Sequence, residues 1–291
     1  MESKAENSPY LPGNLAPMSD QVFQRFSSFV YKTVGIKMPP VKKTMLQARL
    51  SKRVRRLGFA DFEEYSRFVF DAGEGNNEMS AMIDIITTNK TDFFREANHF
   101  NYLVESALPA LGFSSNLRPT RDLRVWSAGC SSGQEPYTLA IVLNEYLSRV
   151  PGFGYSITAS DICTEVLKKA VLGIYDEDAI DMLPVTLRKK YFLKGRNGQR
   201  NLVRIIPKLR QTIRFKRLNF MDDAYGFLEK MDIIFCRNVL IYFDAETQNN
   251  VLNRLCDHLH SGGYLFLGHS ETLNGFSLPV KQVAPTIYRK L

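Results

Sequence analysis

Apolar residues recur every three or four positions through the first third of the chain. The first such stretch follows Ser19 and Asp20, which can cap a helix N-terminus, and it ends at Gly35. The same spacing predicts four further helices over about 41–57, 61–72, 77–88 and 96–108. Because no strand pattern interrupts these stretches, we predict an all-α domain over residues 18–95, preceded by a flexible segment over residues 1–17.

Beyond about residue 119, short apolar runs alternate with helical stretches. The runs at Leu123–Trp126, Ser156–Ala159 and Met231–Cys236 predict buried strands, and each is followed by a helical pattern. We expect these helices over about 135–147, 164–172 and 245–260, and two last strands at Tyr264–Gly268 and Thr286–Lys290. Strands that alternate with helices are typical of a mostly parallel sheet covered on both faces, so we predict an α/β domain over residues 96–291.

One segment of this second domain departs from the alternation. Two apolar runs, Tyr191–Leu193 and Leu202–Ile206, flank the dipeptide Asn197-Gly198. Asn-Gly between apolar runs is a strong hairpin signal, because both residues readily adopt positive φ. We therefore predict a small antiparallel β-subdomain, inserted at about residues 191–212.

The composition excludes several classes of protein. The chain has 291 residues, of which 44% are hydrophobic, and its longest apolar runs hold five or six residues, against the roughly 20 that a membrane-spanning helix needs. The polar N-terminus lacks the order of a signal peptide. Cys130, Cys163, Cys236 and Cys256 form no C-x-x-C pair, and the four histidines do not pair with them at ligand spacing. We expect a cytoplasmic protein with no membrane insertion and no metal site.

The charge indicates an anionic partner. Lys and Arg number 38 and Asp and Glu 30, which leaves a net charge of +8. The predicted helix over 41–57 contains basic residues and no acid, and its apolar stripe places the basic residues on an exposed face. From this face we select four residues as a docking surface for an acidic partner: Lys52, Arg53, Arg55 and Arg56. A generic solvated helix face is the alternative.

The candidate chemistry follows the ends of the predicted strands, where open α/β sheets bind their ligands. The first strand runs into a turn bounded by Gly129 and Gly133, with Glu135 at the start of the next helix. The second strand ends at Asp161, whose carboxylate can accept hydrogen bonds from both hydroxyls of a ribose. Each feature alone also fits an ordinary strand-to-helix turn or a helix-capping aspartate.

Together, the glycine turn and the acid indicate an adenosine-containing cofactor. G-x-G-x-x-G is absent, and the turn offers no lysine for a triphosphate, so a pyrophosphate cofactor is disfavoured. A ligand with a ribose and no phosphate fits better, and S-adenosylmethionine is the common one. Two more polar clusters accompany these residues: Arg237-Asn238 with Tyr242 after a buried strand, and Asn89–Glu96 between the two predicted domains.

In this order, the clusters resemble the chemotaxis receptor methyltransferases, the CheR-type protein-glutamate O-methyltransferases. The resemblance extends from about Ser19 to Leu291, and Leu267-Gly268-His269-Ser270-Glu271 adds to it. Its four main motifs are Asn89-x-Thr91-x-Phe93-Phe94-Arg95-Glu96, Ser127–Tyr137, Ser160–Leu167 and Phe235–Phe243. The family implies a Rossmann-like methyltransferase domain that binds S-adenosylmethionine, a small all-α N-terminal domain and an inserted antiparallel β-subdomain.

The resemblance also implies site residues. Nine positions match cofactor contacts of the family: Asn89, Thr91, Arg95, Glu135, Asp161, Asn219, Phe220, Arg237 and Asn238. We further expect Arg95 to orient the substrate carboxylate or the cofactor, and Tyr242 to wall the path of the methyl group and hydrogen-bond a reacting oxygen. The chain departs from the usual family pattern at Gln134, where Glu is frequent, and at Cys163, where Asp is frequent; both neighbour the implied cofactor contacts.

The implied reaction transfers the methyl group of S-adenosylmethionine to glutamate side chains of chemoreceptors, leaving S-adenosylhomocysteine and a glutamate methyl ester. A glutamate carboxylate is already ionised at pH 7, so no general base is required. The implied partners are the cytoplasmic helices of methyl-accepting chemoreceptors, with a receptor tether peptide as a further ligand of the β-subdomain. We expect a monomer, with no nucleic acid bound.

Two other functions fit parts of the sequence. Gly129-Cys130-Ser131-Ser132-Gly133 satisfies G-x-S-x-G, so Ser131 is the candidate nucleophile of an α/β serine hydrolase. Against this, only helices precede the motif, and no acid-then-His order is compelling. A nucleic-acid methyltransferase would explain the net charge equally well, but the sequence has Arg237-Asn238-Val239-Leu240 where such enzymes usually carry an Asp/Asn-Pro-Pro-aromatic motif.

Overall fold

The computed structural model describes residues 15–71, 77–114, 121–150, 152–195 and 201–291. The chain divides into two compact units, each described here by itself. The first comprises residues up to Lys32 together with Met38–Ile86, and the second comprises Thr33–Lys37 and Thr87–Leu291. The predicted domain boundary is at residue 95, whereas in the structure residues 87–95 belong to the second unit. Most of the predicted flexible N-terminal segment, residues 1–14, lies outside the described residues.

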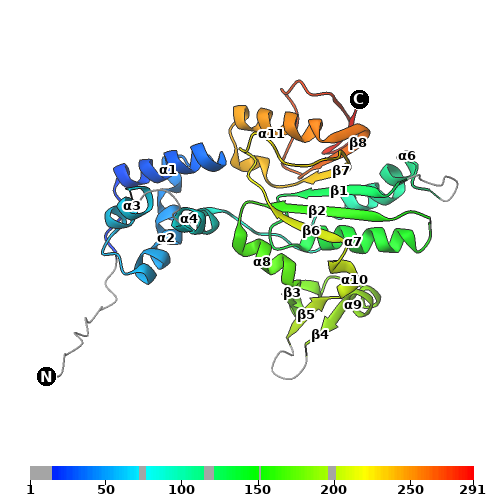
Figure 1. The fold of residues 1–291 in the computed structure, drawn as a ribbon, viewed down its shortest axis with the longest axis horizontal. Coiled ribbons are helices and arrows are strands. Elements are labelled where there is room, and N and C mark those ends of the chain that lie inside the picture. Colours follow the sequence, from blue (N-terminus) through cyan, green and yellow to red (C-terminus); the bar gives the residue numbers. More distant parts are fainter. Residues whose placement is uncertain (1–14, 72–76, 115–120, 151, 196–200) are drawn as a thin grey trace. The chain divides into compact units, whose positions relative to one another are not determined.

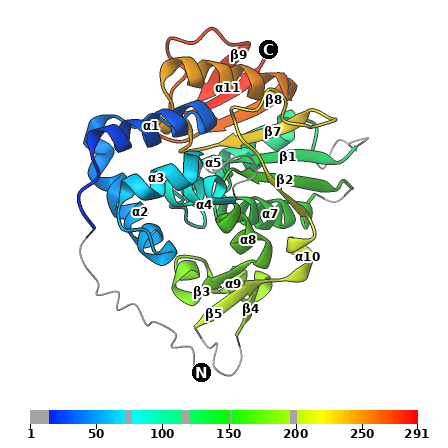
Figure 2. The same ribbon diagram turned by 60° about the vertical axis from the view of Figure 1, so that its left-hand side comes forward.

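The first unit is built from helices, as the spacing of apolar residues predicts (Figures 1 and 2). Leu46, Leu50 and Val54 form a fully buried stripe on the second helix, and Gly58, with φ 82°, ends it. Among the described residues of this unit there is no strand. Its elements are α1 (Asp20–Val34), the 3₁₀ turn η1 (Pro40–Lys42), α2 (Lys43–Leu57), α3 (Phe62–Asp71) and α4 (Asn77–Ile86).

The second unit contains a seven-stranded sheet in the order β6-β2-β1-β7-β8-β10-β9. Neighbouring strands are parallel from β6 through β8, whereas β10 and β9 are antiparallel, which gives the mostly parallel sheet that the alternating pattern predicts. The strands are β1 (Leu123–Ala128), β2 (Tyr155–Asp161), β6 (Ile213–Arg217), β7 (Met231–Cys236), β8 (Leu259–Leu267), β9 (Val280–Ala284) and β10 (Ile287–Lys290).

Hydrophobic cores cover both faces of this sheet. Val125 and Trp126 are consecutive on β1, and because side chains alternate along a strand they belong to different cores. The core that contains Val125 is packed by α7 (Gln134–Leu147) and α8 (Thr164–Leu172), and the core that contains Trp126 is packed by α11 (Ala245–Asp257) (Figure 1). The predicted layered α/β architecture is confirmed.

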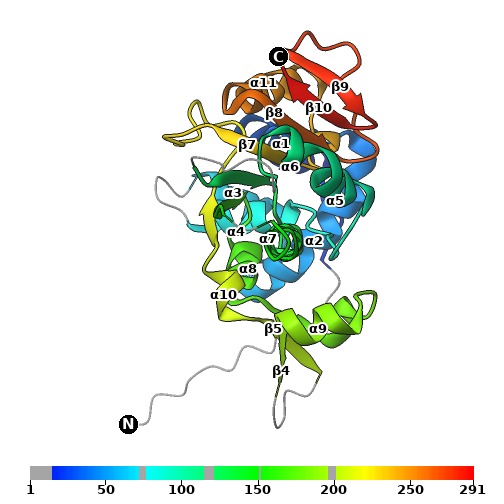
Figure 3. The ribbon, with the colours of Figure 1, turned by 90° about the vertical axis from the view of Figure 1, so that its right-hand side faces the viewer.

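The small antiparallel sheet is also confirmed, but it begins earlier than predicted. Its order is β3-β5-β4, with β3 (Ile174–Asp176), β4 (Phe192–Lys194) and β5 (Leu202–Ile205) (Figure 1). Figure 3 shows β4 and β5 from another side. β3 was missed because three residues are too short to show an alternating pattern. The predicted Asn197-Gly198 turn lies outside the described residues. The subdomain also includes η3 (Glu177–Ile180), α9 (Val185–Tyr191) and α10 (Pro207–Arg210).

Two other predicted elements are corrected. The helix predicted over 96–108 is a short α5 (Asn98–Tyr102), a π-helical turn η2 (Leu103–Ala107) and α6 (Leu108–Ala110). The strand predicted from Tyr264 begins earlier, at Leu259, so that Gly262-Gly263 lies inside β8, where the register with β7 shifts and Gly262 adopts φ 78°. Such irregularities are typical places for glycine in a strand. No helix in the described ranges has the length and apolarity that crossing a membrane would require.

Candidate cofactor and active site

The polar residues predicted to form the site follow three neighbouring parallel strands. In the sheet, β1 lies between β2 and β7 (Figure 1). The loop 129–133 and Glu135 follow β1, Asp161 ends β2, and Arg237 follows β7. Because parallel strands have their carboxyl ends at one edge of a sheet, the fold brings these residues to the same edge.

The loop over 129–133 requires glycine at both of its ends. Gly129 has φ 83°, and a Cβ built there would lie 2.4 Å from Val239 Cγ2. Gly133 has φ 97°, and its Cβ would lie 2.9 Å from the Cβ of Ala170. Residues other than glycine rarely adopt such φ values, and neither position leaves room for a side chain. The loop therefore approaches its neighbours as closely as a bare backbone allows.

Asp161 ties this loop to the end of β2. Its carboxylate accepts hydrogen bonds from the backbone N–H of Ser131 at 2.8 Å and from that of Cys163 at 2.9 Å. The residue is buried, with 9% of its surface exposed. These bonds orient the carboxylate at the strand end, where the sequence analysis expects the ribose hydroxyls of a cofactor.

The hydroxyl of Ser131 is used structurally. It donates to the backbone carbonyl of Asn89 at 2.7 Å, and within the described ranges it contacts no histidine. A serine hydrolase needs a base in hydrogen-bond reach of its nucleophile. The arrangement therefore gives no support to Ser131 as a nucleophile.

Arg237 is a buried cation between two carboxylates. Only 2% of its side chain is exposed, and its Nη1 lies 3.6 Å from Glu135 Oε2. On the other side, Nη2 and Nε lie 3.2 and 3.3 Å from Glu96 Oε2, and Nη2 also donates to the carbonyl of Arg95. The guanidinium stacks over Phe100 and Phe235 as well. The cost of burying this charge is thus offset by two acids and two aromatic rings.

Glu135 lies in the first turn of α7 and is oriented by a second contact. Its Oε1 accepts a hydrogen bond from the hydroxyl of Ser127 at 2.7 Å. Burial raises the pKa of Glu135, and the charge of Arg237 and the Ser127 hydroxyl oppose this rise. A positive ligand group beside this carboxylate would stabilise its charged form further.

The buried carboxylate of Glu271 holds the loop after β7. Glu271 belongs to a predicted motif, but no role was predicted for it. Glu271 is 4% exposed and accepts four backbone N–H hydrogen bonds at 2.7 to 2.8 Å. The donors are Gly268, Asn238, Val239 and Leu240. Burial raises the pKa of Glu271, and these donors lower it. Asn238 adopts φ 58°, so this carboxylate stabilises a loop that contains an unfavourable backbone conformation.

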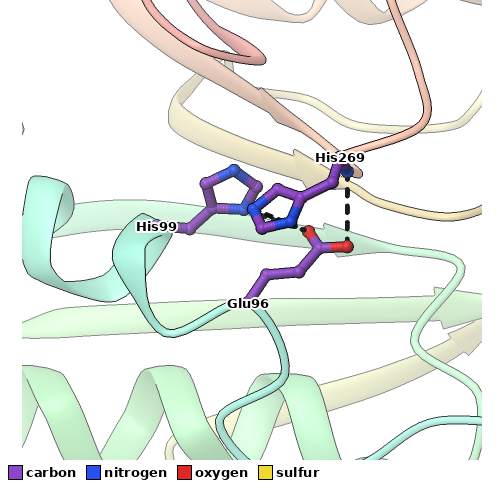
Figure 4. Close-up of side chains that lie close together, drawn as sticks. All are labelled: Glu96, His99 and His269. Carbon is purple, nitrogen blue, oxygen red and sulfur yellow. Dashed lines mark hydrogen bonds and ion pairs between the residues drawn. The ribbon is translucent and has the colours of Figure 1, made fainter.

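Figure 4 shows Glu96 beside two histidines, His99 and His269. Glu96 Oε2 lies 3.5 Å from His99 Nδ1 and 3.9 Å from His269 Nε2, and the ligand atoms of all three residues lie within 4.8 Å of one another. These residue types can bind a metal, and the sequence analysis considered only histidine paired with cysteine. The Glu96 carboxylate, however, already accepts hydrogen bonds from Arg237, Asn238 and the backbone of His269. We interpret it as a hydrogen-bonding centre.

His99 makes stability depend on pH. Burial, followed by the charge of Arg237, lowers the pKa of His99 from 6.5 to about 4, although Glu96 opposes the shift. Between these values the unfolded chain binds a proton that the folded chain excludes, so the free energy of unfolding falls as the pH drops through this window. We expect His99→Gln to reduce that fall by roughly 1–3 kcal/mol, measured by urea unfolding at several pH values. If the free energy of unfolding fell with pH as steeply in His99→Gln as in the unchanged protein, His99 would not be held neutral in the folded state.

The predicted contacts on the segment before α5 fall into two groups. The carbonyl of Asn89 accepts the Ser131 hydroxyl, and its side-chain Nδ2 lies 3.6 Å from Cys163 Sγ, so it meets the loops after β1 and β2. Arg95 bonds with Nη1 to the carbonyl of Lys90 at 3.2 Å. Thr91 is half-buried. Asn89 therefore lies beside the 129–133 loop and the residues that follow Asp161. Arg95, in contrast, contacts Arg237 through the Arg95 backbone carbonyl.

Three further predicted residues follow β6 and β7. Asn219 donates with Nδ2 to the carbonyl of Thr33 at 2.6 Å. Phe220 packs edge-on against Phe243, with ring centroids 6.3 Å apart. Tyr242 ends the 3₁₀ turn η5 (Leu240–Tyr242), and in the part of the chain that the structure describes its hydroxyl has no hydrogen-bond partner.

The predicted basic face of α2 is wrong at Arg53. This guanidinium pairs with Glu78 of α4, with Nε 2.9 Å from Oε1, and the hydroxyl of Tyr65 donates to the same oxygen at 2.7 Å. Its side chain is 17% exposed, and the hydrogen bond to Glu78 raises its pKa. α2 itself contains no acidic residue, so the carboxylate that pairs with Arg53 comes from α4. Lys52, Arg55 and Arg56 are exposed, as expected.

Comparison with known proteins supplies the family. Two family models match the chain. The model described as "CheR methyltransferase, SAM binding domain" matches residues 89–288, and the model described as "CheR methyltransferase, all-alpha domain" matches residues 21–87. The chain is 41% identical to the chemotaxis protein methyltransferase of Borreliella burgdorferi over 91% of its length and 93% of the relative's. It is 38% identical to that of Salmonella typhimurium, over 93% and 90%, and 36% identical to chemotaxis protein methyltransferase 2 of Pseudomonas aeruginosa, over 91% of each chain.

Both the predicted resemblance and the predicted cofactor are therefore confirmed. The matched ranges coincide with the two units of the fold, the helical one and the one whose strand ends carry the candidate site. The chain belongs to the CheR methyltransferase family and is an S-adenosylmethionine-dependent methyltransferase.

Proposed function

We propose that this protein methylates glutamate side chains of chemoreceptors, giving glutamate methyl esters for adaptation in chemotaxis. The observation that carries the proposal is the similarity to chemotaxis protein methyltransferases over nine tenths of the chain. The geometry supports it, because two oriented carboxylates, Glu135 and Asp161, lie where a positively charged nucleoside cofactor needs acceptors.

The cofactor fits the residues present. We propose that Asp161 accepts the ribose hydroxyls and that Glu135 accepts the amino group of the methionine part. Asn219 and Phe220 lie beside the adenine, and Phe220 offers a ring face for stacking. The remaining proposed contacts line the rest of the site: Asn89, Thr91, Arg95, Arg237 and Asn238. When bound, the cofactor supplies an activated methyl group on a sulfonium.

The protein contributes orientation and exclusion of water. An ionised glutamate needs no base, and both the carboxylate and the sulfonium lose charge as the methyl moves, so water stabilises the reactants more than the transition state. Good alignment alone can supply roughly 7–11 kcal/mol of the barrier reduction. We propose that Arg95 orients the carboxylate or the cofactor. We also propose that Tyr242 walls the methyl path and donates to a reacting oxygen.

The proposed substrate explains the basic face of α2. Receptor helices rich in glutamate would be attracted to Lys52, Arg55 and Arg56, which speeds encounter. Arg53 is left out of this surface because it pairs with Glu78. We further propose a monomer, and the antiparallel β-subdomain as the docking site of a receptor tether peptide. Its outer strands β3 and β4 each have one edge that pairs with no strand among the described residues.

Reversing the charge of this face tests the docking role. We expect the triple variant K52E/R55E/R56E to methylate receptors roughly tenfold more slowly at low salt, because electrostatic attraction is lost, with unchanged cofactor affinity in calorimetry. The matched control R149E/K230E/K281E makes the same charge change at exposed positions of the second unit that lie outside the β-subdomain. An equal loss in both variants would show that net charge, not this face, determines the rate.

The activity itself is tested with tritiated S-adenosylmethionine and receptor-bearing membranes. We expect label in the receptor that mild base releases as methanol, since methyl esters hydrolyse and methyl amines do not. Receptors in which the accepting glutamates are replaced by alanine are the control. Base-stable label in the receptor would contradict the formation of a methyl ester. Label in added nucleic acid, with binding that falls steeply with salt, would instead support a nucleic-acid methyltransferase.

A further inference from the structure

Glu96 contacts two of the proposed cofactor residues without being one of them. Its Oε2 lies 3.2 Å from Arg237 Nη2 and 3.3 Å from Arg237 Nε. Its Oε1 lies 3.5 Å from Asn238 Nδ2 and also accepts the backbone N–H of His269 at 3.3 Å. The side chain is 10% exposed, and φ at this residue is 58°, so the chain adopts an unfavourable conformation to place it.

Arg237 lies closer to Glu96 than to Glu135. Its nitrogens approach Glu96 to 3.2 Å but Glu135 only to 3.6 Å. Burial raises the pKa of Glu96, but Arg237 and the His269 backbone lower it further, so that the carboxyl is held ionised. Two carboxylates and one guanidinium leave one net negative charge in this cluster. If Glu96 were neutral, Arg237 and Glu135 would cancel each other.

We propose that Glu96 is a positioning residue that holds Arg237 back from Glu135 and keeps the cofactor pocket negative. This inference rests on the proposed roles of Glu135 and Arg237 as cofactor contacts. Glu135 then keeps its charge for the amino group of the cofactor. The negative pocket also favours S-adenosylmethionine over S-adenosylhomocysteine, because the two differ by the positive charge of the sulfonium. Glu96 thereby helps to release the product.

The ratio of the two ligand affinities separates this role from a purely structural one. We expect Glu96→Gln to weaken S-adenosylmethionine binding roughly tenfold and S-adenosylhomocysteine binding about two- to threefold, measured by titration calorimetry. Glu96→Asp keeps the charge, so its affinity ratio should stay near that of the unchanged protein even if both affinities fall. Asp and Asn tolerate positive φ, so E96D and E96N repeat the comparison if the Gln variant does not fold.

A matched control removes a different carboxylate that pairs with an arginine. Glu229 bonds to Arg124 at 2.6 Å and lies just before β7, whereas Arg237 follows it, so it is at the opposite end of the same strand. E229Q should leave both affinities unchanged. Equal losses for the two ligands in E96Q, or no loss, would overturn the inference. Failure of the unchanged protein to bind either ligand would instead contradict the proposed function.

Discussion

Replacing Arg237 with methionine should abolish cofactor binding and lower the free energy of unfolding by roughly 3–5 kcal/mol. The guanidinium is 2% exposed and faces Glu96 and Glu135, whose side chains are 10% and 13% exposed. Methionine fills much of the same space without a charge or a donor. Two largely buried carboxylates would then lack the cation between them, which is why the cost exceeds that of a surface ion pair.

Calorimetry with S-adenosylhomocysteine and urea unfolding measure these two effects separately. Arg124→Met is the control, because Arg124 also pairs with an acid, Glu229, but that acid is 61% exposed and the pair should contribute little. In the double variant R237M/E96Q one unpaired carboxylate is gone, so part of the lost stability should return. Wild-type affinity in R237M would show that the arginine is not part of the cofactor site.

The layered fold could be predicted because each of its main elements is long and periodic. The buried strands Leu123–Ala128 and Met231–Cys236 and the helices between them show their patterns locally. The edge of the sheet that carries the site was predictable for a related reason. In parallel sheets, chain order determines which loops meet, so Asp161 and Glu135 could be placed together without any knowledge of distances.

The contacts that hold the site in place depend on partners far apart in the chain, and no local pattern encodes them. Arg237 meets Glu96 across 141 residues, and Glu271 meets Asn238 across 33. The same reason explains the error at Arg53, whose partner Glu78 lies on another helix. The sequence did contain a signal for Glu271. An acid within a few residues of the end of an apolar strand must find hydrogen-bond donors if it is buried. The sequence alone could not say which donors.

Those donors make Glu271 the second position where we expect a large effect. Glu271→Ala would leave four buried backbone N–H groups without an acceptor: those of Gly268, Asn238, Val239 and Leu240. Each such group costs about 1–3 kcal/mol when water does not reach it. We expect a loss of roughly 4–6 kcal/mol in urea unfolding, the lower part of the range for four such groups, because water can enter the space that the carboxylate leaves. This loss is a large part of the 5–15 kcal/mol typical of a domain. Cofactor affinity should fall with it, because Asn238 would no longer be held at φ 58°.

Glu271→Gln separates the hydrogen bonds from the shape of the side chain. The amide keeps one accepting oxygen, but its nitrogen would face backbone donors and repel them, so its effect should lie between those of alanine and the unchanged protein. Glu105→Ala, at an exposed carboxylate of the same unit, should change stability by less than about 0.5 kcal/mol. If E271Q were as stable as the unchanged protein and bound the cofactor equally well, the loop after β7 would not depend on a charged acceptor. Its geometry would then have to come from the packing of Val239 against Gly129.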